Sequence, residues 1–160
     1  MRIALLAALV ALAPASVMAL SCTPHSVQAA FAQAQAAKER YLIVQGQLDF
    51  DLSLVVDKWG KHNPAPETLV IEAQLTGHSL SARGFKRPYA KSVELVLECF
   101  GPWCGQATPR KPVLAFVELG AERDVIRTNP CGGYLFTQPT QQMLRAVKGC
   151  FAGGACTPPR

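Results

Sequence analysis

The sequence predicts a small α+β domain in which β-strands dominate. Three observations lead to this class. Five segments between Tyr41 and Thr128 carry apolar side chains at alternate positions or in short apolar runs, a pattern typical of strands. A helical pattern precedes these segments and another follows them. All six cysteines follow an apolar leader, and an even number of cysteines in an exported chain is typical of a disulfide-bonded domain.

The first 19 residues are typical of a removable signal peptide. Arg2 gives a positive start, an apolar run covers residues 3–13, and Val17-Met18-Ala19 places small residues at the cleavage positions. The run is too short for a transmembrane helix, which needs about 20 apolar residues. Cleavage would leave residues 20–160, enough for one domain with its own core but not for two full domains.

The signal peptide also predicts where the protein works. It is short and rich in Ala and Leu, which favours the bacterial periplasm over release outside the cell. The alternative is a lipid anchor, because Ala19-Leu20-Ser21-Cys22 resembles a lipoprotein processing site with Cys22 as the acylated residue. Leu20 stands one position later than such sites require, so ordinary cleavage after Ala19 is the favoured interpretation.

Two helices are expected, one at each end of the mature chain. Thr23 can cap the first and Pro24 suits its first turn, and the helix should continue to about Lys38. Its apolar side chains recur at helical spacing: Val27, Ala30, Phe31, Ala34 and Ala37. The second helix is expected from about Pro139 to Lys148.

The strands are expected between these helices, separated by turn-rich loops at 57–67, 77–88 and 101–112. Val125–Thr128 is short and is expected to be an edge strand or the return of a hairpin. Five antiparallel strands can remove their exposed edges by closing into an OB-like barrel, and we predict that architecture. The expected strands are Tyr41–Phe50, Leu69–Leu75, Val93–Cys99, Val113–Leu119 and Val125–Thr128.

The cysteines are expected to form three disulfides. Six cysteines allow 15 pairings, so spacing alone leaves the connectivity open. We favour two short bridges, Cys99–Cys104 and Cys150–Cys156, with Cys22–Cys131 tying down the N-terminus. A zinc site is the alternative, but the histidines are far from the cysteines in sequence and the spacings do not suit a metal. No metal or cofactor is expected.

The start of the mature chain resembles a known family. The segment Cys22–Phe31, with Pro24 two residues after the cysteine and Gln28-Ala29-Ala30-Phe31 after it, is similar to the opening of the tissue inhibitors of metalloproteinases. These belong to the netrin-like family, so the resemblance implies a netrin-like OB barrel over residues 20–160 and binding to a secreted protease. In that family a Cys-x-Cys begins the protein, and the first cysteine chelates the protease zinc through its amine and carbonyl.

This chain departs from the family at the chelating position, because Leu20 stands where the first cysteine would be. The resemblance therefore makes Leu20, Ser21 and Cys22 candidate partner-binding residues, with no disulfide at the first of them.

A second candidate surface is a basic segment with aromatic neighbours. Cations beside aromatic rings suit a phosphate, a sulfate or an acidic sugar, so a small anionic ligand or an acidic glycan is the alternative partner. The simpler interpretation is a solvated loop whose aromatic side chains pack inward. Export, a modest formal charge of +5 and the lack of a long basic run argue against nucleic acid. The candidates are Arg83, Phe85, Lys86, Arg87 and Tyr89.

Catalysis finds little support in the residues. Pro102-Trp103-Cys104-Gly105 resembles part of a thioredoxin loop but lacks the second cysteine that would resolve a mixed disulfide. Glu94 and Glu98 lie four residues apart on an expected strand, roughly 13 Å, too far for a retaining glycosidase pair. We therefore predict a secreted binding or protein-interaction module of undetermined oligomeric state. An enzyme whose site the sequence does not reveal is the third hypothesis.

Overall fold

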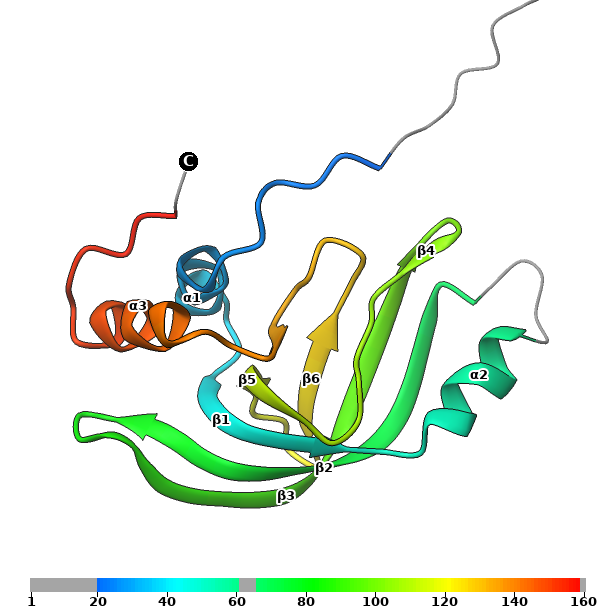
Figure 1. Ribbon diagram of the computed structural model, residues 1–160, viewed down its shortest axis with the longest axis horizontal. Helices are drawn as coiled ribbons and strands as arrows, with labels where there is room; N and C mark the ends of the chain where they lie inside the picture. Colours follow the sequence, from blue (N-terminus) through cyan, green and yellow to red (C-terminus); the bar gives the residue numbers. More distant parts are fainter. Residues whose placement is uncertain (1–19, 61–65, 159–160) are drawn as a thin grey trace, which may run out of the picture.

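A computed structural model describes residues 20–60 and 66–158, without the side chains of residues 57–60. The signal peptide, part of the loop predicted at 57–67 and the Trp59 side chain lie outside the described residues. The described part contains three helices and seven strands, which confirms the mainly β, α+β class (Figure 1). The elements are α1 Val27–Ala36, β1 Tyr41–Asp49, α2 Leu52–Gly60, β2 Thr68–Ser81, β3 Gly84–Phe100, β4 Trp103–Cys104, β5 Lys111–Glu118, β6 Asp124–Thr128, β7 Leu135–Thr137 and α3 Gln141–Phe151.

The strand pairings run in a ring. β1 pairs antiparallel with β2 on one side and with β5 on the other, and β2 pairs antiparallel with β3. β6 pairs parallel with β3 and meets β5 at Glu118 and Val125. Of the two alternatives predicted for Val125–Thr128, the edge strand is wrong, because β6 lies between β3 and β5. The hairpin return is confirmed, because β6 pairs antiparallel with the preceding strand β5. β4 and β7 are short additions to β3 and β5.

β2 and β3 form one long hairpin, and this corrects the loop predicted at 77–88. Pairing continues to Ser81 and Gly84, so only Ala82 and Arg83 remain as the turn. The register shifts between Ser79 and Leu80, and such a bulge interrupts the strict alternation by which strands are recognised in sequence. In the figure the hairpin extends to the left, beneath α1 and α3 (Figure 1).

Two hydrophobic clusters flank β5. Val113, Ala115 and Val117 point into the cluster enclosed by the ring, whereas Leu114 and Phe116 point into a second cluster under α1 and α3. A strand buried on both faces is continuously apolar, as the sequence of β5 is. The second cluster therefore attaches the helices to the outside of the ring.

The two predicted helices are present with shifted ends. Ser26, not Thr23, caps α1 by accepting a hydrogen bond from the Ala29 N–H through its Oγ. Thr140 caps α3 in the same way toward Met143. α2 was not predicted; its Leu52, Leu54 and Val56 are exposed, while Val55 packs against the cluster enclosed by the ring.

The three disulfides that the sequence favoured are present: Cys22–Cys131, Cys99–Cys104 and Cys150–Cys156. The first joins residues 109 positions apart and brings the N-terminal segment to the loop between β6 and β7. No helix in the described ranges has the length and apolar character needed to cross a bilayer.

Candidate functional site

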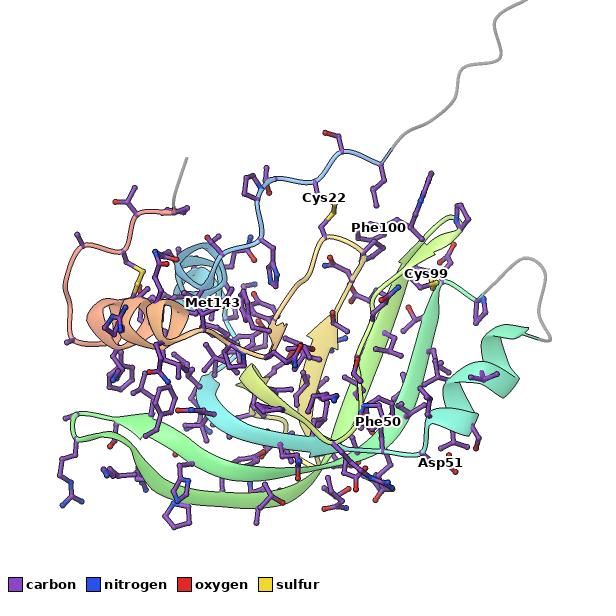
Figure 2. All side chains as sticks on the ribbon, viewed as in Figure 1. Cys22, Phe50, Asp51, Cys99, Phe100 and Met143 are labelled. Carbon is purple, nitrogen blue, oxygen red and sulfur yellow. A yellow bond between two sulfur atoms is a disulfide. The ribbon has the colours of Figure 1, made fainter. Side chains whose placement is uncertain are left out.

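The N-terminal segment lies against one end of the strand ring. Residues 20–22, the β3–β4 turn at 99–104 and the loop at 129–133 surround a groove of about 520 Å³; we call these three segments the N-terminal ridge. Leu20 lines the groove from the first segment, Trp103 from the second and Asn129 from the third. Figure 2 places Cys22 and Phe100 at this same end of the molecule.

The β3–β4 turn presents two aromatic side chains in a fixed frame. Cys99 pairs with Cys104 and Phe100 with Trp103 across the turn, and a disulfide joins the two cysteines. Gly101 supplies the positive φ of 61° that the reversal requires. Phe100 and Trp103 are each 43% exposed, so the two rings are held in place while remaining open to solvent.

The loop between β6 and β7 is held by its own hydrogen bonds. The Asn129 side chain accepts a bond from the Cys131 N–H, and its carbonyl accepts one from the Gly132 N–H. The Thr128 hydroxyl donates to the Gly132 carbonyl at 2.8 Å. The loop therefore offers Cys22 a preformed anchoring point.

His25 completes the attachment and was not identified from the sequence. Its ring stacks on Phe136 with centroids 4.0 Å apart, and its Nε2 donates to the Gly133 carbonyl at 2.9 Å. Gly132 makes room for the ring, because a Cβ there would collide with it. These partners lie more than 100 residues from His25 in sequence, so no local pattern could reveal the contact.

We expect the free energy of unfolding to fall in mild acid because of His25. Burial lowers the pKa of His25 below its ordinary value of 6.5. The unfolded chain therefore takes up the proton first as the pH falls below about 6.5, and the folded state loses stability until its own His25 also titrates. Urea unfolding between pH 7.5 and 5.5 should show this loss, and His25→Phe, which keeps the stacking, should reduce it. His78→Gln, at an exposed position, is the matched control; an equal reduction in both variants would contradict the assignment.

The basic candidate segment is split by the fold. Arg83, Lys86 and Arg87 are exposed at the turn end of the β2–β3 hairpin. Phe85 packs against the second hydrophobic cluster, the one under α1 and α3, and Tyr89 is only 6% exposed. Thus the aromatic side chains pack inward, as the simpler interpretation of this segment expected.

Tyr89 has a structural role in the interior. Its hydroxyl donates to Asp124 Oδ2 at 2.8 Å, and Lys91 Nζ lies 2.9 Å from the same oxygen. Burial and the Asp124 carboxylate raise the pKa of Tyr89 well above its usual range. The structure does not bring Tyr89 to the surface beside the cations, nor the cations to the N-terminal ridge, which lies at the other end of the long hairpin (Figure 1).

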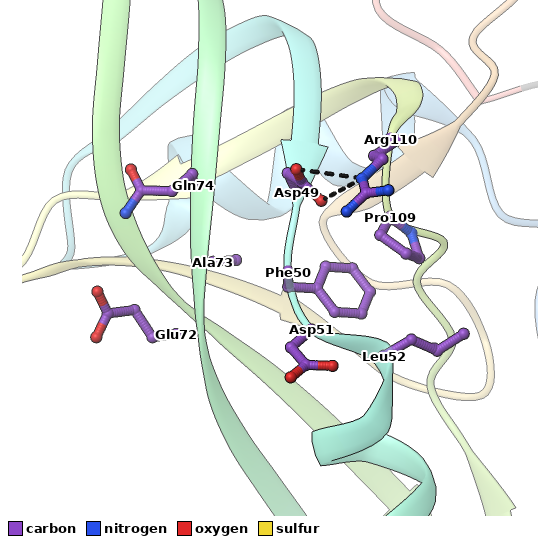
Figure 3. Close-up of a pocket in the computed structure, with 9 residues that line it drawn as sticks. All are labelled: Asp49, Phe50, Asp51, Leu52, Glu72, Ala73, Gln74, Pro109 and Arg110. Carbon is purple, nitrogen blue, oxygen red and sulfur yellow. Dashed lines mark hydrogen bonds and ion pairs between the residues drawn. The ribbon is translucent and has the colours of Figure 1, made fainter.

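A wider groove of about 850 Å³ lies where β1 leads into α2 (Figure 3). Two of the carboxylates that line it form ion pairs: Asp49 pairs with Arg110 at 3.2 Å, and Glu72 on β2 pairs with Arg123 at 3.3 Å. Asp51 accepts a hydrogen bond from the Ser53 N–H, and hydrogen bonding with Ser53 lowers its pKa. The described residues contain no group of three His, Cys, Asp or Glu side chains placed to hold a metal.

The remaining catalytic candidates take structural positions. Cys104 is bonded to Cys99, and the described residues contain no free cysteine. Glu94 and Glu98 alternate on β3 with the buried Leu95 and Leu97, so their side chains lie on the outer face. Neither pattern forms a catalytic cluster.

Comparison with known proteins returns no relative. No protein-family model matches the chain, and neither does any curated protein or solved structure. The netrin-like resemblance therefore stays a prediction carried by Cys22–Phe31 and by the order of the elements.

Proposed function

We propose that this chain is an exported protein-interaction module that binds its partner through the N-terminal ridge. The observation that carries this proposal is the gathering of Leu20, Phe100 and Trp103 at one end of the molecule, 37%, 43% and 43% exposed, beside a groove. Exposed aromatic side chains in a fixed frame are typical of the residues that dominate binding energy in protein interfaces.

The frame of the ridge supports binding without a large ordering cost. The Cys22–Cys131 disulfide restrains the N-terminal segment, and Cys99–Cys104 restrains the aromatic turn. A segment that is already ordered loses less conformational entropy on binding than a free one. The ridge therefore has the rigidity that a docking surface requires.

The proposed architecture is a netrin-like OB barrel. Its support is the ring of pairings β1–β2–β3–β6–β5, with β5 returning to β1 and β6 parallel to β3. A five-stranded Greek-key barrel of the OB type removes sheet edges in this way. The flanking α1 and α3 pack together on the outside of the ring.

The proposed partner is a secreted zinc protease. Its support is the resemblance of Cys22–Phe31 to the metalloproteinase inhibitors, together with the position of Leu20 beside the groove. If cleavage follows Ala19, the amine of Leu20 begins the ridge and Ser21 follows it into the anchored Cys22. This arrangement would offer a protease a short extended segment flanked by Trp103. Three disulfides are typical of an oxidising compartment, and we propose the bacterial periplasm.

We expect the oxidised protein to inhibit at least one member of a panel of secreted zinc endopeptidases, and Trp103→Ala to weaken that inhibition about tenfold or more. The reason is that Trp103 supplies the largest exposed apolar surface of the ridge. The measurement is the inhibition constant of each variant against the same protease. Val70→Ala, which removes an exposed apolar side chain from β2, is the control and should leave the constant unchanged.

Two outcomes would contradict this proposal. If the protein at high micromolar concentration inhibits none of the proteases in the panel, a secreted zinc protease is not its partner. The assignment of the ridge fails if inhibition occurs but Trp103→Ala and Val70→Ala are indistinguishable.

A further inference from the structure

The opposite end of the molecule carries cations without carboxylates. The sequence has no Asp or Glu between Ala73 and Val93, and none after Asp124. These stretches include the turn end of the β2–β3 hairpin and the whole of α3. Five exposed cations lie on these two elements, and none forms an ion pair with another described residue: Arg83, Lys86, Arg87, Arg145 and Lys148.

Two adjacent grooves lie between α1, α3 and the β2–β3 turn, and Lys148 is the one of the five cations that lines them. The first, of about 250 Å³, runs between α1, β1 and the end of α3 and has Phe31, Ile43 and Phe116 among its walls. The second, of about 240 Å³, runs from α3 to the β2–β3 turn and reaches Lys148. Leu80 and Phe151 line both grooves, so the two grooves are neighbours that meet at these side chains. The combined volume of the two grooves lies within the roughly 300–1,000 Å³ typical of small-molecule sites.

We propose that these grooves bind a free, single-chain anionic amphiphile of the fatty-acid type. The alkyl chain would lie in the apolar first groove and pass Phe151, and the carboxylate would lie in the second groove near Lys148 and the turn that carries Arg83. Apolar area removed from water drives the binding, and the cations select an anion over a neutral or cationic head group.

The charge distribution fixes the direction in which the amphiphile lies. Tyr41 lines the first groove and not the second, and its hydroxyl lies 3.5 Å from the Glu118 carboxylate. Burial raises the pKa of Tyr41, and the nearby charges of Glu118 and Glu39 raise it further. Arg127 pairs with the Glu118 carboxylate at 3.1 Å, so the direction is set chiefly by Lys148, which favours an anionic head in the second groove.

The shape of the site favours a free chain over a bilayer surface. A protein that lies on a membrane inserts a protruding apolar face between the lipids. Of the large apolar side chains on the described part of α3 and the hairpin turn, only Phe151 is exposed, at 45%. Phe31, Leu80 and Phe116, which line the first groove, are at most 7% exposed, so the apolar surface beside Phe151 is recessed and does not protrude as a membrane-inserting face would.

The test is isothermal titration of the oxidised protein with sodium dodecanoate below its micelle concentration, with dodecyltrimethylammonium as the probe of opposite charge. Dodecanoate should bind and the cationic amphiphile should not, and added salt should weaken binding because exposed charges are screened. Lys148→Glu should weaken dodecanoate binding about tenfold, while Lys111→Glu, an exposed cation on β5, should not.

A second pair of variants tests the apolar groove. Ala34→Phe fills the groove from α1 and should weaken dodecanoate binding about tenfold or more, whereas Ala32→Phe makes the same change at an exposed position outside it. Circular dichroism should show that both variants remain folded. Trp103→Ala should leave dodecanoate binding unchanged, which separates this site from the N-terminal ridge.

Three outcomes would overturn the proposal. The first is equal binding of the anionic and cationic amphiphiles, and the second is undiminished binding by Ala34→Phe. The third is binding to phosphatidylglycerol vesicles without binding to dodecanoate, which would identify the cationic end as a membrane-docking surface instead.

Discussion

Replacing both cysteines of the Cys22–Cys131 bridge by serine is expected to lower the free energy of unfolding by about 4 kcal/mol. The bridge joins residues 109 positions apart, and a crosslink that closes so long a loop removes much conformational entropy from the unfolded chain. The measurement is equilibrium unfolding in urea of the oxidised wild type and the double variant.

The Cys99–Cys104 bridge offers a matched control. Its cysteines are only five positions apart, so the equivalent double serine variant should lose about 2 kcal/mol. Equal losses in the two double variants would contradict the view that Cys22–Cys131 ties distant parts of the domain together.

The second large effect is expected for Gly46→Ala, in which one added methyl group should lower the free energy of unfolding by about 3 kcal/mol. Gly46 faces Gly77 across the β1–β2 pair, and a Cβ on Gly46 would collide with the Thr76 carbonyl oxygen. A Cβ on Gly77 would collide in the same way with the Gln45 carbonyl oxygen. Because the obstacles are backbone atoms, they cannot move aside as a side chain can. Urea unfolding of Gly46→Ala measures the cost.

Gly149→Ala is the matched control for this substitution. Gly149 lies within α3, is exposed and has open space around the position of a Cβ. Alanine there should raise stability by about 0.5–1 kcal/mol, because glycine weakens a helix interior. A cost below about 1 kcal/mol for Gly46→Ala would show that β1 and β2 can separate at the glycine pair without loss.

Local patterns predicted β1 through its alternation and β5 through its continuous apolar run. β1 and β5 appear close to their expected bounds, because Leu42, Val44 and Leu48 alternate in β1 and β5 is buried on both faces. The turn half of the β2–β3 hairpin was missed because the bulge after Ser79 interrupts the alternation. The central position of β6 was not predicted, because it depends on parallel pairing with β3, which is distant in sequence. The five residues of β6 carry no local pattern that identifies this partner.

The candidate sites show the same division between local and distant information. The cysteine spacing and the compartment led to the disulfides, so the anchoring of Cys22 could be expected. His25 could not, because its stacking on Phe136 depends on the folded ring. Tyr89 and Arg87 stand two residues apart, so strand alternation puts them on the same face of β3. Tyr89 is buried where its hydroxyl meets Asp124, whereas Arg87 lies nearer the hairpin turn and is exposed, a difference that the local pattern does not show.

The most direct test of the N-terminal ridge is to compare two forms of the oxidised protein against a protease that it inhibits. One form begins at Leu20 and the other carries one additional alanine before Leu20; intact mass and N-terminal sequencing confirm each form. If the amine of Leu20 enters the protease, the extra residue should weaken inhibition at least about tenfold, while an alanine added after Arg160 should not. Equal inhibition by all three forms would contradict the claim that the N-terminal segment makes the contact.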